Sequence, residues 1–108
     1  MITRGSVCLV EESGVGGRRP VLVVQAEPFN RSRIPTLLGI PLSSHVHLAD
    51  APGNVLVPAA ASGLLRNTVA VVSGLHAFER GSLRETHGRL TAPLLEAIDH
   101  GLRLVLGL

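Results

Sequence analysis

A short apolar run directly after a proline constrains this chain more than any other feature. Residues 21–25 read Val-Leu-Val-Val-Gln, and Pro20 stands immediately before them. The run does not alternate between polar and apolar residues, so it predicts a strand that is buried on both faces. Any fold for this chain must therefore cover that strand from two sides.

Two arginines on a glycine-rich turn precede this strand. Gly16 and Gly17 lead into Arg18 and Arg19, and the following proline holds Arg19 in an extended conformation. A guanidinium presents several N–H donors in a planar fork that suits phosphate. The arrangement indicates a phosphate-binding position at the start of the strand. The simpler interpretation is a solvated or ion-paired residue at a strand end.

The composition limits the fold and the possible functions. The chain has 108 residues, no Trp or Tyr and two Phe, so we expect one domain, residues 1–108, with an aliphatic core. All ten basic residues are arginines, and the sequence pI is about 10.0. The single Cys8 excludes an internal disulfide. No Cys/His motif with the full set of ligands for a metal site occurs, so we expect no metal and no other cofactor.

The sequence also predicts where the protein acts. No apolar run approaches the length of about 20 residues that a membrane-spanning helix needs. Residues 1–4 lead directly into strand-like sequence, so we expect no signal peptide. A cytoplasmic location is the expectation that follows.

Short strand-like segments fill most of the chain, and a helix closes it. The segments are residues 7–10, 21–25, 36–40, 55–58, 68–73 and 84–90, and residues 75–78 could extend the fifth segment past Gly74. From Thr91 the apolar period becomes helical, with Pro93 in the first turn and Gly107 at the end. The predicted fold is mainly β with short helices: a small bent antiparallel sheet or half-barrel, closed by a C-terminal amphipathic helix across its open side.

Several motifs occur in a specific order along the chain. They are RGSV at residues 4–7, RRPVLVVQ at 18–25, PLSS at 41–44, PGNV at 52–55, NTVA at 67–70 and LGL at 106–108. This ordered set resembles the MazF/PemK family of toxin endoribonucleases of type II toxin–antitoxin systems, and the resemblance runs the length of the chain. It implies a homodimer of bent β-barrels that cleaves single-stranded RNA, often messenger RNA, without a metal. It also implies a cognate antitoxin as a protein partner.

The resemblance assigns catalysis to two residues. The family's arginine before proline corresponds to Arg19, and the threonine of its PLTS motif corresponds to Ser43. The implied reaction is attack of the RNA 2′-hydroxyl on the adjacent phosphate, which yields a 2′,3′-cyclic phosphate and a 5′-hydroxyl. We expect Arg19 to stabilise the charge that develops on the phosphate, and Ser43 to donate a hydrogen bond.

The expected RNA contacts surround these two positions. They are Gly17, Arg18, Arg31, Ser44 and His45, together with the loop of residues 11–17. The near absence of aromatic residues argues against a broad platform for base stacking.

The other histidines carry only weak functional signals. The spacing of His45 and His47 is compatible with a metal site, but two histidines without further ligands are a weak signal. We expect surface or packing roles for His76, His87 and His100.

Other functions are compatible with the same residues. One alternative is an attenuated or non-enzymatic member that binds antitoxin or RNA, because Ser43 replaces threonine and the loop of residues 11–17 is short. Another is a poison of DNA gyrase on the same fold, as CcdB-type toxins are. The plainest is a small β-barrel interaction module.

Overall fold

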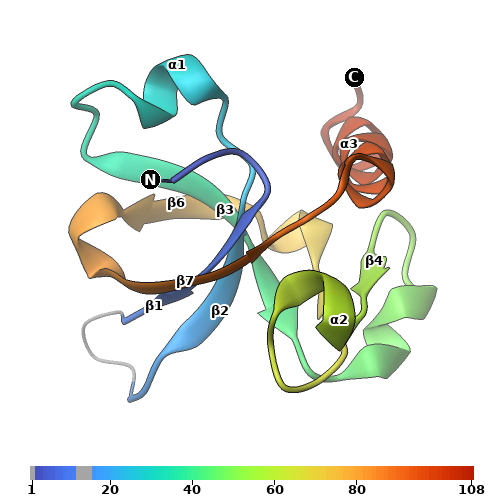
Figure 1. Ribbon diagram of the computed structural model, residues 1–108. Helices are drawn as coiled ribbons and strands as arrows, with labels where there is room; N and C mark the ends of the chain where they lie inside the picture. Colours follow the sequence, from blue (N-terminus) through green and yellow to red (C-terminus); the bar gives the residue numbers. More distant parts are fainter. Residues whose placement is uncertain (1, 12–15) are drawn as a thin grey trace.

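The computed structural model describes residues 2–11 and 16–108, which form a strongly curled antiparallel sheet with helices at its edges (Figure 1). The strands in this part of the chain are β1 (Ser6–Val10), β2 (Arg19–Val23), β3 (Thr36–Ser43), β4 (Val55–Val57), β5 (Thr68–Ala70), β6 (His76–Glu79) and β7 (Leu83–Arg89). The helices are α1 (Glu27–Asn30), α2 (Ala59–Ser62) and α3 (Ala92–Leu106), with 3-10 turns η1 (Val46–Asp50), η2 (Val72–Gly74) and η3 (Arg80–Ser82). The predicted mainly β half-barrel with short helices is confirmed.

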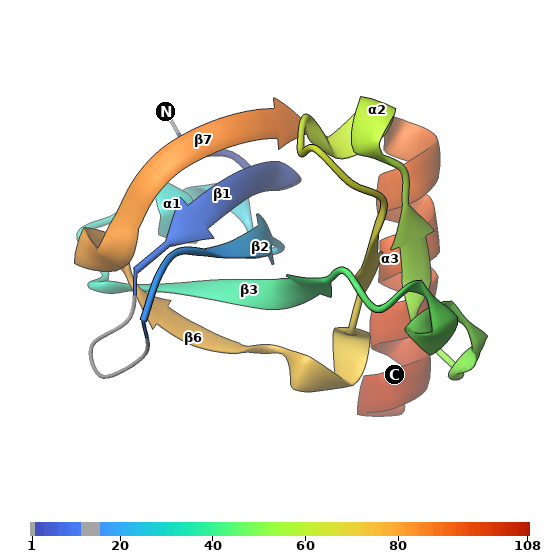
Figure 2. The same cartoon turned by 90° about the horizontal axis from the view of Figure 1, so that it is seen from below.

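The central strand β3 explains why the sheet curls. One edge of β3 pairs with β2, and β2 continues the sheet to β1 and β7. On the other edge, residues 36–39 pair with β6 and residues 42–43 pair with β5. Two different strands therefore share one edge of β3, and the sheet divides and bends at that point (Figure 2).

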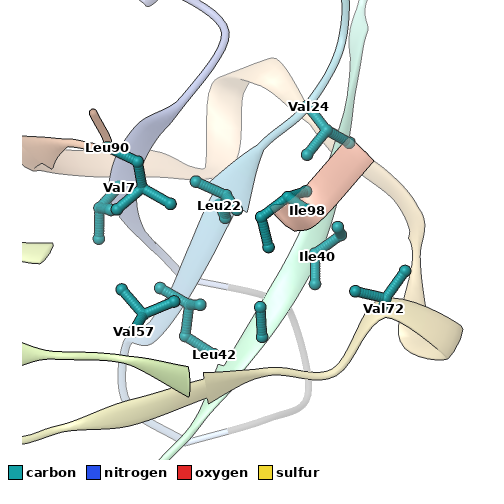
Figure 3. Packing of buried hydrophobic residues seen from close by; sticks show 10 residues of the cluster. Val7, Leu22, Val24, Ile40, Leu42, Val57, Val72, Leu90 and Ile98 are labelled. Carbon is teal, nitrogen blue, oxygen red and sulfur yellow. The ribbon is translucent and has the colours of Figure 1, made fainter. Parts of the chain in front are cut away.

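Strand β2 is buried on both faces, as the sequence predicts. Leu22 belongs to a larger core cluster that also holds Ile40 and Ile98 (Figure 3). Val21 and Val23 point to the opposite face and belong to a second cluster with Cys8, Val10 and Phe78. The alternation of side chains along β2 thus supplies apolar contacts to both clusters.

The C-terminal helix α3 covers the open side of the curled sheet and begins and ends where the sequence predicts (Figure 2). Thr91 precedes its first turn, and Gly107 ends it with a φ of 71°. Ile98 is fully buried, and Leu94 and Leu102 pack against the larger core. Within the described residues, no helix combines the length and apolar character needed to cross a membrane.

The continuation of residues 68–73 into 75–78 does not occur. The turn η2 separates β5 from β6, and these two strands pair with different parts of β3. Gly74 packs tightly against Pro41, since a Cβ at Gly74 would lie 2.9 Å from Pro41 Cγ. Glycine therefore permits a close turn here, where the strand would otherwise run on.

Arg4 joins the start of the chain to two distant elements. Its backbone N–H donates to Glu27 Oε1 over 2.6 Å, and its Nε donates to the Val24 carbonyl over 2.8 Å. Its guanidinium also forms an ion pair with Asp99 of α3 at 2.5 Å. Arg4 therefore has a structural role, because its contacts link α3 and the residues after β2 to the segment that leads into β1.

Candidate active site

Arg19 is the first residue of β2, and the chain around it restricts its backbone. Gly17 has a φ of 80°, a left-handed conformation that glycine adopts without steric penalty. Pro20 follows and keeps Arg19 extended, while Val10 of β1 lies opposite Arg19 in the sheet. The Arg19 side chain is exposed, so a backbone held by the sheet presents its guanidinium to solvent.

Ser43 ends β3, and the strand register brings it beside Arg19. Val21 of β2 lies opposite Pro41 of β3. The strands are antiparallel, so two residues before Val21 on β2 correspond to two residues after Pro41 on β3. This register places Arg19 opposite Ser43. Because residues two apart on a strand share a face, the Arg19 and Ser43 side chains lie on one face of the sheet.

Both side chains line a single cavity of about 300 Å³. The residues around it are Arg19, Pro20, Val21, Pro41, Leu42, Ser43, His76 and Phe78. The cavity thus combines one guanidinium, one hydroxyl and one imidazole with largely apolar walls. Such walls strengthen the attraction between a cation and an anionic group, because they replace water around it. The arrangement suits a single phosphate.

The Ser43 hydroxyl is oriented by the loop that follows β3. The backbone N–H of His45 donates a hydrogen bond to Ser43 Oγ over 3.1 Å. This bond uses one lone pair of Ser43 Oγ and leaves the hydroxyl hydrogen available for donation to a group in the cavity. The His45 ring lies beside the His47 ring, with centroids 5.8 Å apart, and is not among the groups that line the cavity.

His76 is the cavity residue that sequence reasoning missed. It begins β6 opposite Gly39 of β3, and its ring Nδ1 lies 2.8 Å from the Gly74 carbonyl oxygen. The imidazole also packs against Phe78, with ring centroids 3.9 Å apart. No motif marks His76 in the sequence, because its place in the cavity depends on the pairing of β6 with β3. Our expectation of a surface or packing role is therefore incomplete.

Arg18 stands beside Arg19 but lies in a network of carboxylates. It forms ion pairs with Glu85 at 3.2 Å and with Glu11 at 3.7 Å, and Arg84 also pairs with Glu11 at 3.4 Å. All four side chains are substantially exposed, so each pair contributes little to stability. The carboxylates offset the charge of Arg18, whereas Arg19 is the arginine among the residues that line the cavity.

Other reactive groups are poor candidates for the site. Burial raises the pKa of the Cys8 thiol, and Cys8 lies in the apolar cluster under β2, so it is unsuited to act as a nucleophile. A wider cavity of about 540 Å³ is lined by Glu11 and Glu79 as well as Arg84, and Arg84 is paired with Glu11, so its charged lining does not favour a phosphate. In residues 2–11 and 16–108, no three His, Cys, Asp or Glu side chains are grouped to hold a metal ion.

Comparison with known proteins identifies the family. The family model of the PemK-like, MazF-like toxins of type II toxin–antitoxin systems matches residues 3–106. The chain belongs to this family. The match covers nearly the whole MazF-like chain, and it contains both Arg19 and Ser43.

Individual relatives agree with this assignment. The endoribonuclease MazF6 of Mycobacterium tuberculosis is 40% identical over 91 residues, which cover 84% of this chain and 80% of the relative. Endoribonuclease EndoA of Bacillus subtilis is 26% identical over 113 residues, covering 100% of this chain and 97% of EndoA.

Solved structures of MazF-like toxins share the fold. An endoribonuclease from a mycobacterial species, solved in complex with its cognate antitoxin, superimposes with a TM-score of 0.82 at 21% identity, covering 100% of this chain and 97% of that one. A MazE–MazF structure from Deinococcus radiodurans gives a TM-score of 0.80 at 23% identity, covering 99% and 96% of the two chains. At these identities the superpositions establish the fold alone.

In this MazF-like chain, the other predicted RNA contacts lie on several surfaces. Ser44 lines a separate, largely apolar groove of about 530 Å³ with Pro20 and Leu65. Arg31 follows α1, which lies at the opposite end of the molecule from the start of β2 (Figure 1). Residues 12–15 of the predicted RNA-covering loop fall outside the described residues. The fold therefore brings Arg19 and Ser43 together but separates Arg31 from them.

Proposed function

We propose that this MazF-like toxin is a metal-independent endoribonuclease that cleaves single-stranded RNA, including messenger RNA, at short sequences. The observation that carries the proposal is the shared cavity of Arg19 and Ser43. These two residues come from different strands, and both can donate hydrogen bonds to one phosphate. The relatives named endoribonucleases support the same activity.

The proposed reaction uses the RNA's own 2′-hydroxyl as nucleophile. Its oxygen attacks the adjacent phosphorus as the bond to the 5′ oxygen breaks, which leaves a 2′,3′-cyclic phosphate and a 5′-hydroxyl. Negative charge accumulates on the non-bridging oxygens in the transition state. The Arg19 guanidinium and the Ser43 hydroxyl stabilise that charge from positions set by the β2–β3 register.

RNA binding extends beyond the cavity in this proposal. Gly17 and His45 adjoin Arg19 and Ser43 in the chain, so their backbone groups contact the nucleotides next to the cleaved bond. Arg18 contacts the RNA backbone with a charge weakened by Glu85. Ser44 and Arg31 contact RNA further from the cleaved bond, because neither lines the cavity.

The first test is cleavage of a long single-stranded RNA by the pure protein in excess EDTA, with mapping of the cut sites and end groups. We expect discrete cuts with cyclic phosphate ends. Arg19→Ala should lower the rate by about 10²–10³, the effect of removing one preorganised donor to a developing oxyanion. The matched control is Arg103→Ala, which removes an exposed arginine from α3 and should leave the rate unchanged.

Two results would contradict the proposal. Equal cleavage by the wild-type protein and Arg19→Ala would exclude the assigned site. RNA left intact by the wild-type protein would favour a member that only binds antitoxin or RNA, and inhibition of DNA supercoiling by that protein would favour a gyrase poison.

The proposed partner protein is a cognate antitoxin. Structures of similar toxins were solved with an antitoxin bound. We propose that an acidic, partly disordered antitoxin segment covers the surface that holds Arg18 and Arg19 and so competes with RNA. Residues 1–108 act as one toxin domain in the cytoplasm, where both the messenger RNA and the antitoxin are made.

We also propose that the toxin is a homodimer. Leu56 of β4 and Leu104 of α3 are 45% and 56% exposed and line one groove of about 440 Å³. No Asp, Glu, Lys or Arg is among the residues that line this groove. Leu106 and Leu108 extend the apolar surface towards the end of the chain. A second copy of the same surface covers it, because burying such side chains from water is favourable for both copies.

A further inference from the structure

We propose that α1 and the loop that follows it form a second binding site for single-stranded RNA, apart from the cavity of Arg19 and Ser43. The proposal rests on the proposed endoribonuclease activity. It assigns one RNA base to the face of Phe29 and nearby phosphates to Arg31 and Arg33. This site holds the substrate strand at a distance from the cleaved bond.

Phe29 is one of two phenylalanines in the chain, and it lies outside the core. The other, Phe78, is 4% exposed and belongs to the smaller core cluster, whereas Phe29 is 54% exposed. The Phe29 ring therefore adds little to the core. It offers solvent an aromatic face, and any base can stack on such a face because every base has a π-face of its own.

Two arginines in the loop between α1 and β3 supply positive charge beside this ring. Arg31 and Arg33 are both exposed, and within residues 2–11 and 16–108 neither forms an ion pair. Residues 28–35 contain no acidic residue. The carboxylate of Glu27 on α1 accepts hydrogen bonds from Arg4 and Asn30. Both guanidinium groups of the loop can therefore bind phosphates.

Arg80 of η3 fixes the backbone of this loop. Its guanidinium donates hydrogen bonds to the carbonyl oxygens of Ile34 at 3.1 Å, Asn30 at 3.0 Å and Phe29 at 3.3 Å. The Ser32 hydroxyl also donates to the Phe29 carbonyl over 2.7 Å. The backbone that carries the aromatic ring and the two loop arginines is thus ordered before RNA binds. A preorganised surface loses less conformational entropy on binding.

This combination of groups favours single-stranded RNA as the occupant. Single strands are held by a positively charged track for the phosphates together with aromatic side chains for the bases. The same strand also enters the cavity in the proposed reaction. A second contact on one strand raises the overall affinity, because the second binding event is then intramolecular.

Strand β3 connects the two sites. Its first residue, Thr36, follows the loop, and its last residue, Ser43, lines the cavity (Figure 1). At about 3.3 Å per residue, these two residues lie about 23 Å apart. Even at the 3.4 Å per nucleotide of a stacked strand, about seven nucleotides cover this distance, whereas about two nucleotides on each side of the cut do not reach α1. Only long RNA can therefore contact both sites.

The first test measures binding of a 2′-O-methyl RNA, which the protein cannot cleave because its 2′ oxygens carry no hydrogen. With about 20 nucleotides, Phe29→Ala should weaken binding about fivefold or more, the effect of losing one stacked base. Phe29→Trp should retain the affinity. Phe29→Leu keeps an apolar side chain without an aromatic face, so it should lose as much affinity as Phe29→Ala.

The salt dependence of the same binding tests the arginines. Each phosphate contact with a single strand contributes about −0.7 to the slope of log K against log salt concentration. Combining Arg31→Gln with Arg33→Gln should therefore make this slope shallower by about 1.4. The matched control is Arg103→Gln, which changes an exposed arginine of α3 and should leave the slope unchanged.

Cleavage of unmodified RNA of two lengths separates this surface from the cavity. On long RNA below saturation, Phe29→Ala should lower kcat/KM as much as it lowers affinity. On RNA of about four nucleotides centred on the cut, it should cleave as the wild-type protein does, because this RNA does not span the distance to α1.

Several results would overturn the proposal. Equal affinity for long RNA in the wild-type protein, Phe29→Ala and the double arginine variant would do so, as would an equal loss on both lengths of RNA. Tight binding by Phe29→Leu would show that stacking is not used and would favour an apolar protein partner at this surface.

Failure of the endoribonuclease proposal is a distinct outcome. A wild-type protein that binds the 2′-O-methyl RNA as expected but leaves unmodified RNA intact would count against cleavage and not against this surface. A wild-type protein that binds no RNA would contradict both proposals. Circular dichroism of each variant verifies the fold, which we expect to persist because the substituted side chains are exposed.

Discussion

At the scale of single residues, the hydroxyl of Ser43 makes a specific prediction. The His45 N–H holds Ser43 Oγ, but serine lacks the methyl that stiffens the rotamer of threonine. Ser43→Thr should therefore preserve or raise the rate of RNA cleavage. Ser43→Ala should lower it about tenfold, the effect of losing one hydrogen bond of about 1.4 kcal/mol. Cleavage rates of both variants, measured beside the wild-type protein, provide the check, and a slower Ser43→Thr would contradict it.

Glu27 makes the fold sensitive to acid. The backbone N–H of Arg4 and the side chain of Asn30 both donate to its carboxylate, and these hydrogen bonds lower the pKa of Glu27 below its ordinary value. A lowered folded-state pKa stabilises the protein above the unfolded-state pKa. That contribution is lost as pH falls through the lower, folded-state pKa.

Glu27→Gln should therefore lower the free energy of unfolding at neutral pH and reduce its decline in acid. Urea unfolding at about pH 7 and about pH 3 measures both effects. Glu96→Gln is the control, since Glu96 is exposed on α3 and none of the hydrogen bonds found among the described residues involves its carboxylate. If the free energy of unfolding of Glu27→Gln fell in acid as much as that of the wild-type protein, Glu27 would not be the source of the acid sensitivity.

At the scale of elements, the packing of α3 depends on a glycine. Gly101 faces the turn before β4, and a Cβ there would lie within van der Waals overlap of the Gly53 carbonyl oxygen. Alanine favours a helix over glycine by about 1 kcal/mol. The clash is with backbone atoms, which cannot rotate away as a side chain could. The destabilisation by the clash should therefore exceed the gain in helix propensity.

We predict that Gly101→Ala destabilises the protein by about 1–3 kcal/mol despite its better helix propensity. Gly81→Ala is the matched control, because a Cβ at Gly81 meets nothing within 4 Å. Thermal and urea unfolding of the two variants should differ in this direction. Equal stability would show that α3 can shift away from the sheet at little cost.

At the scale of the whole molecule, the exposed apolar surface of β4 and α3 determines the oligomeric state that we propose. Leu104→Glu puts a charge in the groove that a second copy would cover, and desolvating that charge is costly. We predict that the wild-type protein is a dimer and that Leu104→Glu is a folded monomer by sedimentation. Phe29→Glu, an equivalent change of an exposed residue in α1, should remain a dimer. Dimers of both variants would place the interface elsewhere.

Much of the fold could be predicted because its signals are local. The apolar run of residues 21–25 indicated a strand buried on both faces, and the helical period with Thr91 and Gly107 located α3. Boundaries were less well predicted, since β3 runs on to Ser43 and β5 ends at Ala70. Those limits depend on which strands pair, and local propensity carries no information about pairing.

By itself, the sequence determined the class of fold, because proline, glycine and apolar period act on neighbours in the chain. Its ordered motifs indicated the family, and the resemblance to that family pointed to Arg19 and Ser43. Only the tertiary structure decided what surrounds those residues. The pairing of β6 with β3 brought His76 into the cavity, and the pairing of β1 with β2 and β7 set Glu11 and Glu85 against Arg18. Contacts between residues far apart in the chain form only when the sheet closes, which is the physical reason that no short motif foretold them.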